Sequence, residues 1–104
     1  MEIHQLKTFI TVAREGTITR ASEKLHLSQP AVSAHIKAME ESLGFALFER
    51  MPKGMTLTAK GQQLLGGAEK VLDARISFLQ QAEALKSNLA GRLRMGIGSG
   101  SGME

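Results

Sequence analysis

The chain of 104 residues contains no cysteine and only two prolines. Without cysteine, neither a disulfide bond nor a cysteine-based zinc site can stabilise the fold, and the composition suits a reducing compartment. No segment approaches the roughly 20 apolar residues that a membrane-spanning helix needs. The first residues also lack the apolar run of a secretory signal, because Glu2, His4 and Lys7 interrupt it. The sequence therefore predicts a cytoplasmic protein that has no membrane as a partner.

The residue patterns of an enzyme and of a metal site are missing as well. No two of the three histidines have the i, i+4 spacing of metal ligands on a helix, and Glu40 and Glu41 point to different sides of a helix. A glycine-rich stretch over residues 96–102 resembles a phosphate-binding loop, but Ser101 replaces the third glycine of that pattern and no helix follows. We expect no catalytic residue, no metal and no cofactor in this chain.

Charge is distributed unevenly along the sequence. The formal net charge is only +3, but Arg50, Lys53 and Lys60 lie in a stretch from residue 50 to 68 that contains no acidic residue. A protein that is nearly balanced overall can still present a basic face to phosphates. This stretch therefore favours nucleic acid as a partner.

Residues 17–43 predict two short helices joined by a tight turn. Thr17 and Ser28 are suited to be N-caps, because a hydroxyl can accept a hydrogen bond from a free N–H of the first turn. Pro30 falls in the first turn of the second helix, where its missing N–H costs nothing. Leu27, in the turn, is expected to fill the angle between the helices. The second helix carries one apolar stripe at steps of four and three: Val32, Ile36, Met39 and Leu43.

The other face of the second helix is small and polar, which suits close approach to a DNA groove. Gln29 can form two hydrogen bonds with a base edge, most naturally adenine. Ser33 lies one turn later and can meet a base or a phosphate, while Ala31 and Ala34 can touch a thymine methyl group. Contacts with phosphates or with the groove are expected from residues at the helix starts and from polar residues nearby: Thr17, Thr19, Arg20, Lys24, Ser28, His35 and Lys37.

Two further elements flank this pair. Residues 3–15 have the apolar spacing of a supporting helix. Residues 45–58 alternate in polarity around Pro52 and Gly54, which predicts a short hairpin. Its tip would bring Lys53 to a minor groove and Arg50 to the neighbouring backbone. Helix, helix pair and hairpin, in this order, are typical of a winged helix-turn-helix.

Residues 59–90 predict one long helix, with Thr58 as its cap. Such a helix is about 48 Å long, more than a small domain can cover, so its apolar stripe needs a partner. A second copy is the simplest partner, and an absent domain of the same chain is the alternative. Gly66 and Gly67 are a weak point in the helix. The expected dimer interface comprises Leu64, Leu65, Ala68, Val71, Leu72, Phe78, Leu79, Ala82, Leu85 and Leu89.

These elements suggest three regions. Residues 1–58 would form a winged helix-turn-helix domain and residues 59–90 a dimerisation helix. In residues 91–104, apolar side chains alternate as in a strand before a glycine- and serine-rich end. A strand cannot stand alone, so this segment is interpreted as the start of a second, truncated domain.

Several separated motifs occur together in a recognisable order: LKTFITVAREGTITRASEKLHLSQPAVSAHI, then MEESLG, LFER and LTAKG. Over residues 1–97 the chain resembles the N-terminal part of a LysR-type transcriptional regulator. The resemblance implies a mainly α fold, with three helices, a β-hairpin wing and a long dimerisation helix, that binds an imperfect palindrome as a homodimer. It also implies a small-molecule effector that binds a missing C-terminal domain, assembly into tetramers, and RNA polymerase as a further partner.

The family's base-reading positions map onto Gln29, Pro30, Ala31, Ser33 and Ala34, and its wing-tip contact maps onto Lys53. Many members carry arginine where this chain has Ala34 and Lys53. Because lysine is a point charge, it fits a narrow groove less specifically than arginine. An altered target sequence or a weaker direct readout of the bases is therefore expected.

Two other classes of function remain open from the residues alone. The helices could bind another protein, with the basic face incidental. The glycine-rich end could belong to a fragment of a nucleotide-binding enzyme.

Overall fold

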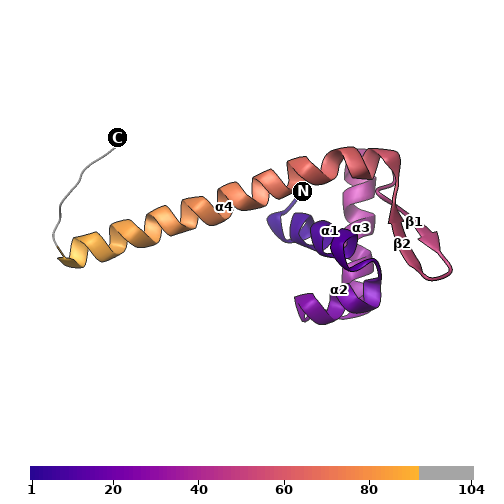
Figure 1. The fold of residues 1–104 in the computed structure, drawn as a ribbon, viewed down its shortest axis with the longest axis horizontal. Coiled ribbons are helices and arrows are strands. Elements are labelled where there is room, and N and C mark those ends of the chain that lie inside the picture. Colours follow the sequence, from indigo (N-terminus) through magenta and orange to yellow (C-terminus); the bar gives the residue numbers. More distant parts are fainter. Residues whose placement is uncertain (92–104) are drawn as a thin grey trace. The chain divides into compact units, whose positions relative to one another are not determined.

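The computed structural model describes residues 1–91, with side chains for residues 1–87. Figure 1 shows the elements in chain order: helices α1 (Ile3–Glu15), α2 (Ile18–Leu25) and α3 (Gln29–Leu43), strands β1 (Phe48–Met51) and β2 (Gly54–Leu57), and helix α4 (Ala59–Gly91). The chain divides into two compact units, Met1–Leu72 and Asp73–Glu104. Of residues 91–104, where a strand was expected, only Gly91 is described, as the last residue of α4; the rest of that segment and the side chain of Leu89 lie outside the described residues.

Helices α2 and α3 begin at the predicted N-caps. The Thr17 hydroxyl accepts a hydrogen bond from the backbone N–H of Arg20 at 3.1 Å, and the Ser28 hydroxyl accepts one from Ala31 at 3.2 Å. Helix α3 ends at Gly44, whose φ of 87° is a left-handed conformation that glycine adopts without steric cost. Local chemistry therefore fixes where both helices begin and where α3 ends.

The core of the first unit lies between α1, α3 and the segment that leads into β1. Phe9 of α1 and Phe48 of β1 meet edge to face, with ring centroids 5.6 Å apart, an arrangement that aromatic rings favour. The predicted stripe of α3 is part of this core. The buried apolar residues are Phe9, Ile10, Val12, Ala21, Val32, Ile36, Met39, Leu47, Phe48 and Ala68.

The turn between α2 and α3 differs from the prediction. Leu27 was expected to fill the angle between the helices, but it is 37% exposed, so this prediction is wrong. His26 takes a left-handed conformation with φ of 58°, and Leu25 rather than Leu27 packs against the core. His26, in its left-handed conformation, ends α2. Leu25, the residue before it, faces inward.

The hairpin is confirmed, although its strands are shorter than the predicted range. Phe48 pairs with Leu57 and Met51 with Gly54 in an antiparallel register, so Lys53 lies in the connecting turn. Leu47 precedes β1 and is fully buried.

Two contacts hold the hairpin on the helices. The N–H of Met55 donates to the Gly16 carbonyl at 2.8 Å. A Cβ atom on Gly54 would overlap that same carbonyl oxygen, so only glycine fits this close approach. The Glu40 carboxylate of α3 accepts hydrogen bonds from the N–H groups of Leu47 at 2.7 Å and Phe48 at 3.3 Å.

The first turns of α4 belong to the first unit. The Thr58 hydroxyl caps the helix by accepting from the N–H of Gly61 at 3.0 Å. Ala68 is only 7% exposed and is part of the core, and Leu65 and Leu72 pack against it. Their own domain therefore buries Ala68 and covers in part the two leucines, all three of which the sequence predicts at the surface facing a second copy.

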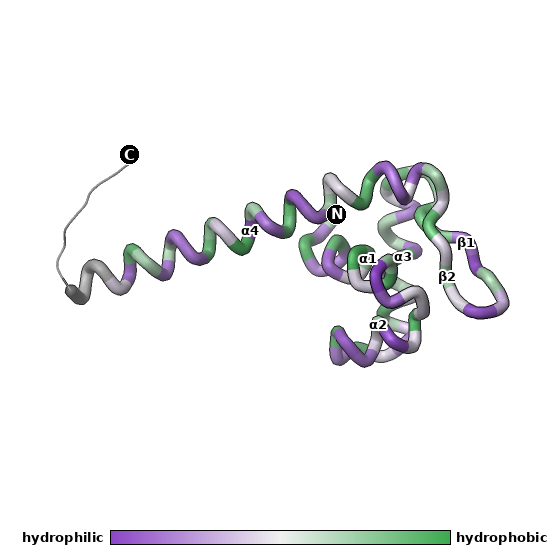
Figure 2. The backbone as a smooth tube through the Cα atoms, viewed as in Figure 1, coloured by the Kyte–Doolittle hydropathy of each residue, from purple (hydrophilic) through white to green (hydrophobic). Residues whose placement is uncertain are grey.

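Beyond these residues the apolar side chains of α4 are exposed. Figure 2 shows hydrophobic positions recurring along this helix. The exposed fraction is 67% for Phe78, 66% for Leu85 and 46% for Leu79. Among the described residues, no helix is both long enough and apolar enough to span a bilayer.

Candidate nucleic-acid interface

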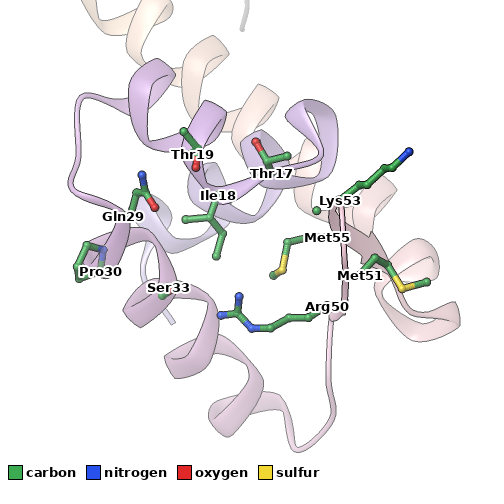
Figure 3. A pocket seen from close by; sticks show the side chains of 11 residues that line it. Thr17, Ile18, Thr19, Gln29, Pro30, Ser33, Arg50, Met51, Lys53 and Met55 are labelled. Atoms are coloured by element: carbon green, nitrogen blue, oxygen red, sulfur yellow. The ribbon is translucent and has the colours of Figure 1, made fainter.

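An open groove of about 610 Å³ lies between the starts of α2 and α3 on one side and the hairpin on the other. Figure 3 shows the side chains that surround it. Residues from three separate stretches of sequence line this groove: Thr17, Ile18, Thr19, Gln29, Pro30, Ser33, Arg50, Met51, Lys53, Gly54 and Met55. Seven of them are residues that the sequence predicted to contact DNA, so the fold brings together much of the predicted site.

The helical side of the groove is polar. Gln29 is exposed at the first position of α3, and Ser33 lies one turn later on the same side. Pro30 shares the first turn, where its missing N–H leaves no orphan donor. Because the starts of both α2 and α3 line the groove, the partial positive charge of two helix N-termini is directed toward it.

The hairpin side of the groove is basic. Arg50 reaches from β1 toward α3, and Lys53 extends from the turn (Figure 3). Both side chains belong to exposed residues. The groove lining, within the residues that the structure describes, includes no aspartate or glutamate. Two cations, two helix N-termini and no acid make this a site that attracts phosphates.

Several predicted contacts lie outside the groove. Ala34 is exposed and Ala31 half-buried on α3, and Ser28 is exposed before its first turn. Lys37 lines a second depression, beside Ser33 and Arg50. These residues remain available to a ligand larger than the groove, as a duplex would be.

Two of the predicted phosphate contacts have acidic neighbours. Arg20 forms an ion pair with Glu15, with Nε and Oε1 3.4 Å apart, and Lys24 shares a depression with Glu15 and Glu23. An exposed ion pair contributes about 0–1 kcal/mol. A phosphate can therefore compete for Arg20, although the acids make this edge less positive than the groove.

His35, which the sequence predicts to contact DNA, is half-buried and its side chain turns toward α1. Its Nδ1 lies 2.8 Å from the Thr8 hydroxyl, and that hydroxyl donates its single hydrogen to the His4 carbonyl at 3.0 Å. His35 Nδ1 is therefore the donor to Thr8. Burial, and secondly the charge of the neighbouring His4, lower the pKa of His35, so the neutral ring is favoured and the side chain acts as a structural link between α1 and α3.

The sequence did not reveal the residues that position the hairpin. Glu40 lies seven residues from Leu47, whose N–H it accepts, and no local motif marks such a bond. Nor did the sequence indicate that the Gly16 carbonyl would accept the hydrogen bond from Met55 that holds the hairpin. Ile18, Met51 and Met55 add an apolar part to the groove lining.

Within the described residues, no three histidine, aspartate or glutamate side chains gather as metal ligands would. The fold and the groove define a winged helix-turn-helix DNA-binding domain. A family model described as bacterial regulatory helix-turn-helix protein, lysR family, matches residues 3–62. The chain belongs to this family and is a DNA-binding domain of a LysR-type transcriptional regulator.

Curated relatives are named as transcriptional regulators, not as enzymes. The chain is 40% identical over 97 residues to HTH-type transcriptional regulator CfxR of Cupriavidus necator, a match that covers 93% of this chain and 31% of CfxR. It is 39% identical over 99 residues to HTH-type transcriptional regulator BudR of Klebsiella aerogenes, covering 95% of this chain and 69% of BudR. The chain thus spans about a third of the length of CfxR.

Solved structures of DNA complexes share the fold. The CbnR_DBD–DNA complex superposes with a TM-score of 0.78 and 37% identity, over 83% of this chain and 99% of that one. The BenM_DBD/catB site 1 DNA complex gives a TM-score of 0.80 and 31% identity, over 84% and 98%.

Proposed function

We propose that this chain is the operator-binding part of a ligand-responsive regulator, which binds an imperfect palindrome as a homodimer. The groove carries this proposal, because it combines a polar helix start with two basic side chains from the hairpin. A recognition helix reads base edges in the major groove with its N-terminal residues. In this chain those residues include Gln29 and Ser33, which lie on the side of α3 that lines the groove.

Roles within the interface follow from side-chain chemistry. Gln29 is the base-reading residue, with Ser33 beside it and the small Ala31 and Ala34 allowing close approach. Lys53 would enter the minor groove, and Arg50 would bind the neighbouring phosphates.

A homodimer is supported by α4, whose apolar side chains beyond Leu72 are exposed. In a two-fold dimer the half-sites lie on one face of the duplex, whole helical turns apart. Response to a small-molecule effector, tetramer formation and contact with RNA polymerase are proposed from the family resemblance; the matched region spans about a third of the relatives CfxR and BsdA.

The base-reading role is tested with a site selected from a randomised DNA pool. We expect Gln29→Ala to lose about 1–3 kcal/mol of discrimination between that site and a scrambled duplex, measured by fluorescence anisotropy. Gln80→Ala is the matched control, since Gln80 is exposed on α4 and does not line the groove. Unchanged discrimination in Gln29→Ala would show that another residue reads the bases.

A further inference from the structure

The turn between α1 and α2 contacts the hairpin close to its tip. The Gly16 carbonyl, which accepts the hydrogen bond from the Met55 N–H, also faces Gly54, where a Cβ atom would overlap it. Gly16 ends α1, and the next residue, Thr17, is the N-cap of α2. Two adjacent residues therefore end one helix, begin the next and contact β2.

Thr17 makes two contacts from one Cβ atom. Its hydroxyl accepts the hydrogen bond from the Arg20 N–H at 3.1 Å. Its methyl carbon Cγ2 lies toward the hairpin, 3.1 Å from the position that a Cβ atom on Gly54 would take. Rotation about χ1 is restricted in a β-branched side chain, so the capping bond of the hydroxyl also fixes the direction of the methyl group. A single side chain thus links the start of α2 to Gly54.

We propose that Thr17 is a positioning residue for the hairpin. Its methyl group sets the place of Gly54 and, with it, of the neighbouring Lys53. Figure 3 shows Thr17 between Thr19 of α2 and Lys53. The inference rests on the proposed contacts of Gln29 and Lys53 with DNA, and it adds the residue that fixes the spacing between them.

The hairpin needs a contact near its tip, because two strands alone are not stable. Glu40 holds the base of the hairpin, since it accepts from the N–H groups of Leu47 and Phe48, and Phe48 belongs to the first pair of the ladder. Gly54 lies at the other end of the ladder, next to the turn that carries Lys53. Contacts at the base leave the tip free to tilt, whereas a contact at Gly54 restrains the tip itself.

The position of the tip matters for DNA because of the chemistry of lysine. Its side chain is a flexible point charge, so the backbone of Lys53 decides where that charge lies. A hairpin that samples several tilts binds DNA only through the fraction in the right place, and the apparent affinity falls by that fraction. A buried methyl group changes an equilibrium constant by about fourfold, which sets the upper size of the effect.

The test is Thr17→Ser, which keeps the hydroxyl, and so the cap, but removes the methyl group. DNA affinity, measured by fluorescence anisotropy, should fall about two- to fourfold. This loss should disappear in a Lys53→Ala background, because the methyl group acts through Lys53. Thr56→Ser is the matched control, since Thr56 is exposed on β2 and does not line the groove. An equal loss in both backgrounds would overturn the proposal.

Amide hydrogen exchange separates positioning from folding. In Thr17→Ser the Met55 amide, which donates to Gly16, should exchange about two- to fourfold faster than in wild type. The Arg20 amide should exchange at the wild-type rate, because serine still accepts its hydrogen bond. Faster exchange at both amides would show that α2 itself has loosened, and this would overturn the positioning role.

Lys53→Ala by itself distinguishes the inference from the function on which it rests. A Lys53→Ala variant that binds DNA like wild type would remove the DNA contact of Lys53 and the inference together. If Lys53→Ala binds more weakly while Thr17→Ser binds like wild type, the positioning role alone falls and the DNA contact stands.

Discussion

Helices α3 and α4 both carry apolar side chains at helical spacing, but the fold uses them differently. The stripe of α3, with Val32, Ile36 and Met39, is buried within its own unit. On α4, Ala68 is buried while Phe78 and Leu85 remain exposed. The same sequence pattern therefore marks a buried core in one helix and an exposed apolar surface in the other, and the difference lies in how much domain is available to cover each helix.

The largest expected effect is the difference in folding stability between substitutions of two phenylalanines, Phe9 and Phe78. Phe9 is 1% exposed, so Phe9→Ala should lower the free energy of unfolding by about 3–5 kcal/mol. Phe78→Ala should change the stability of the monomer by less than about 0.5 kcal/mol while weakening the dimer. Urea denaturation at a concentration where the chain is monomeric measures the first effect, and sedimentation measures the second. Equal destabilisation by both substitutions would contradict the distinction between the helices.

A medium effect concerns the second role of α3, which is to hold the hairpin. Glu40→Ala leaves the N–H groups of Leu47 and Phe48 without their acceptor, at a cost of about 1–3 kcal/mol. DNA affinity should fall as well, because Arg50 and Lys53 lose their fixed position. Glu41→Ala is the control, since Glu41 is the exposed neighbour. If Glu40→Ala and Glu41→Ala have the same free energy of unfolding and the same DNA affinity, Glu40 does not position the hairpin.

A smaller effect distinguishes the groove from the apolar surface of α4 by the salt dependence of binding at each. Lys53→Ala should remove one phosphate contact, lowering the slope of log affinity against log salt by about 1 and the DNA affinity by about fivefold near physiological salt. Lys70→Ala, at an exposed residue of α4 that does not line the groove, should leave that slope unchanged. The constant of the proposed dimer should vary little with salt in either variant, because the α4 residues predicted at its interface are apolar. An unchanged slope in Lys53→Ala would place its side chain away from the phosphates.

The smallest effect is the pH dependence that His35 confers. The pKa of His35 is lowered in the folded protein. As the pH falls, His35 therefore takes up its proton in the unfolded chain, where its pKa has the ordinary value of about 6.5, before it does so in the folded chain. The stability that the neutral His35 contributes is fully present above the unfolded pKa and falls as the pH drops through the folded pKa. Thermal unfolding between pH 8 and 5.5 should show a weaker dependence in His35→Gln than in wild type.

Much of this architecture could be predicted from the sequence, because its signals are local. Thr17 and Ser28 fix the starts of α2 and α3 through bonds to residues three positions away. Gly44 ends α3 through its left-handed conformation. The hairpin turn and the polar side of α3 also follow from short-range patterns, so Gln29, Ser33 and Lys53 were recognisable before their surroundings were known.

The tertiary structure decided which surfaces remain free. His35 follows the exposed Ala34 on α3, but its ring lies inward, where it is hydrogen-bonded to Thr8, 27 residues away in sequence. Ala68 shares a stripe with Phe78, but the core of the first unit buries it. Sequence alone determined the helix ends and the polar start of α3, since hydrogen bonds between near neighbours define them. Only the fold determined the inward turn of His35 and the anchoring of the hairpin by Glu40, because these depend on segments that the chain brings together from farther apart.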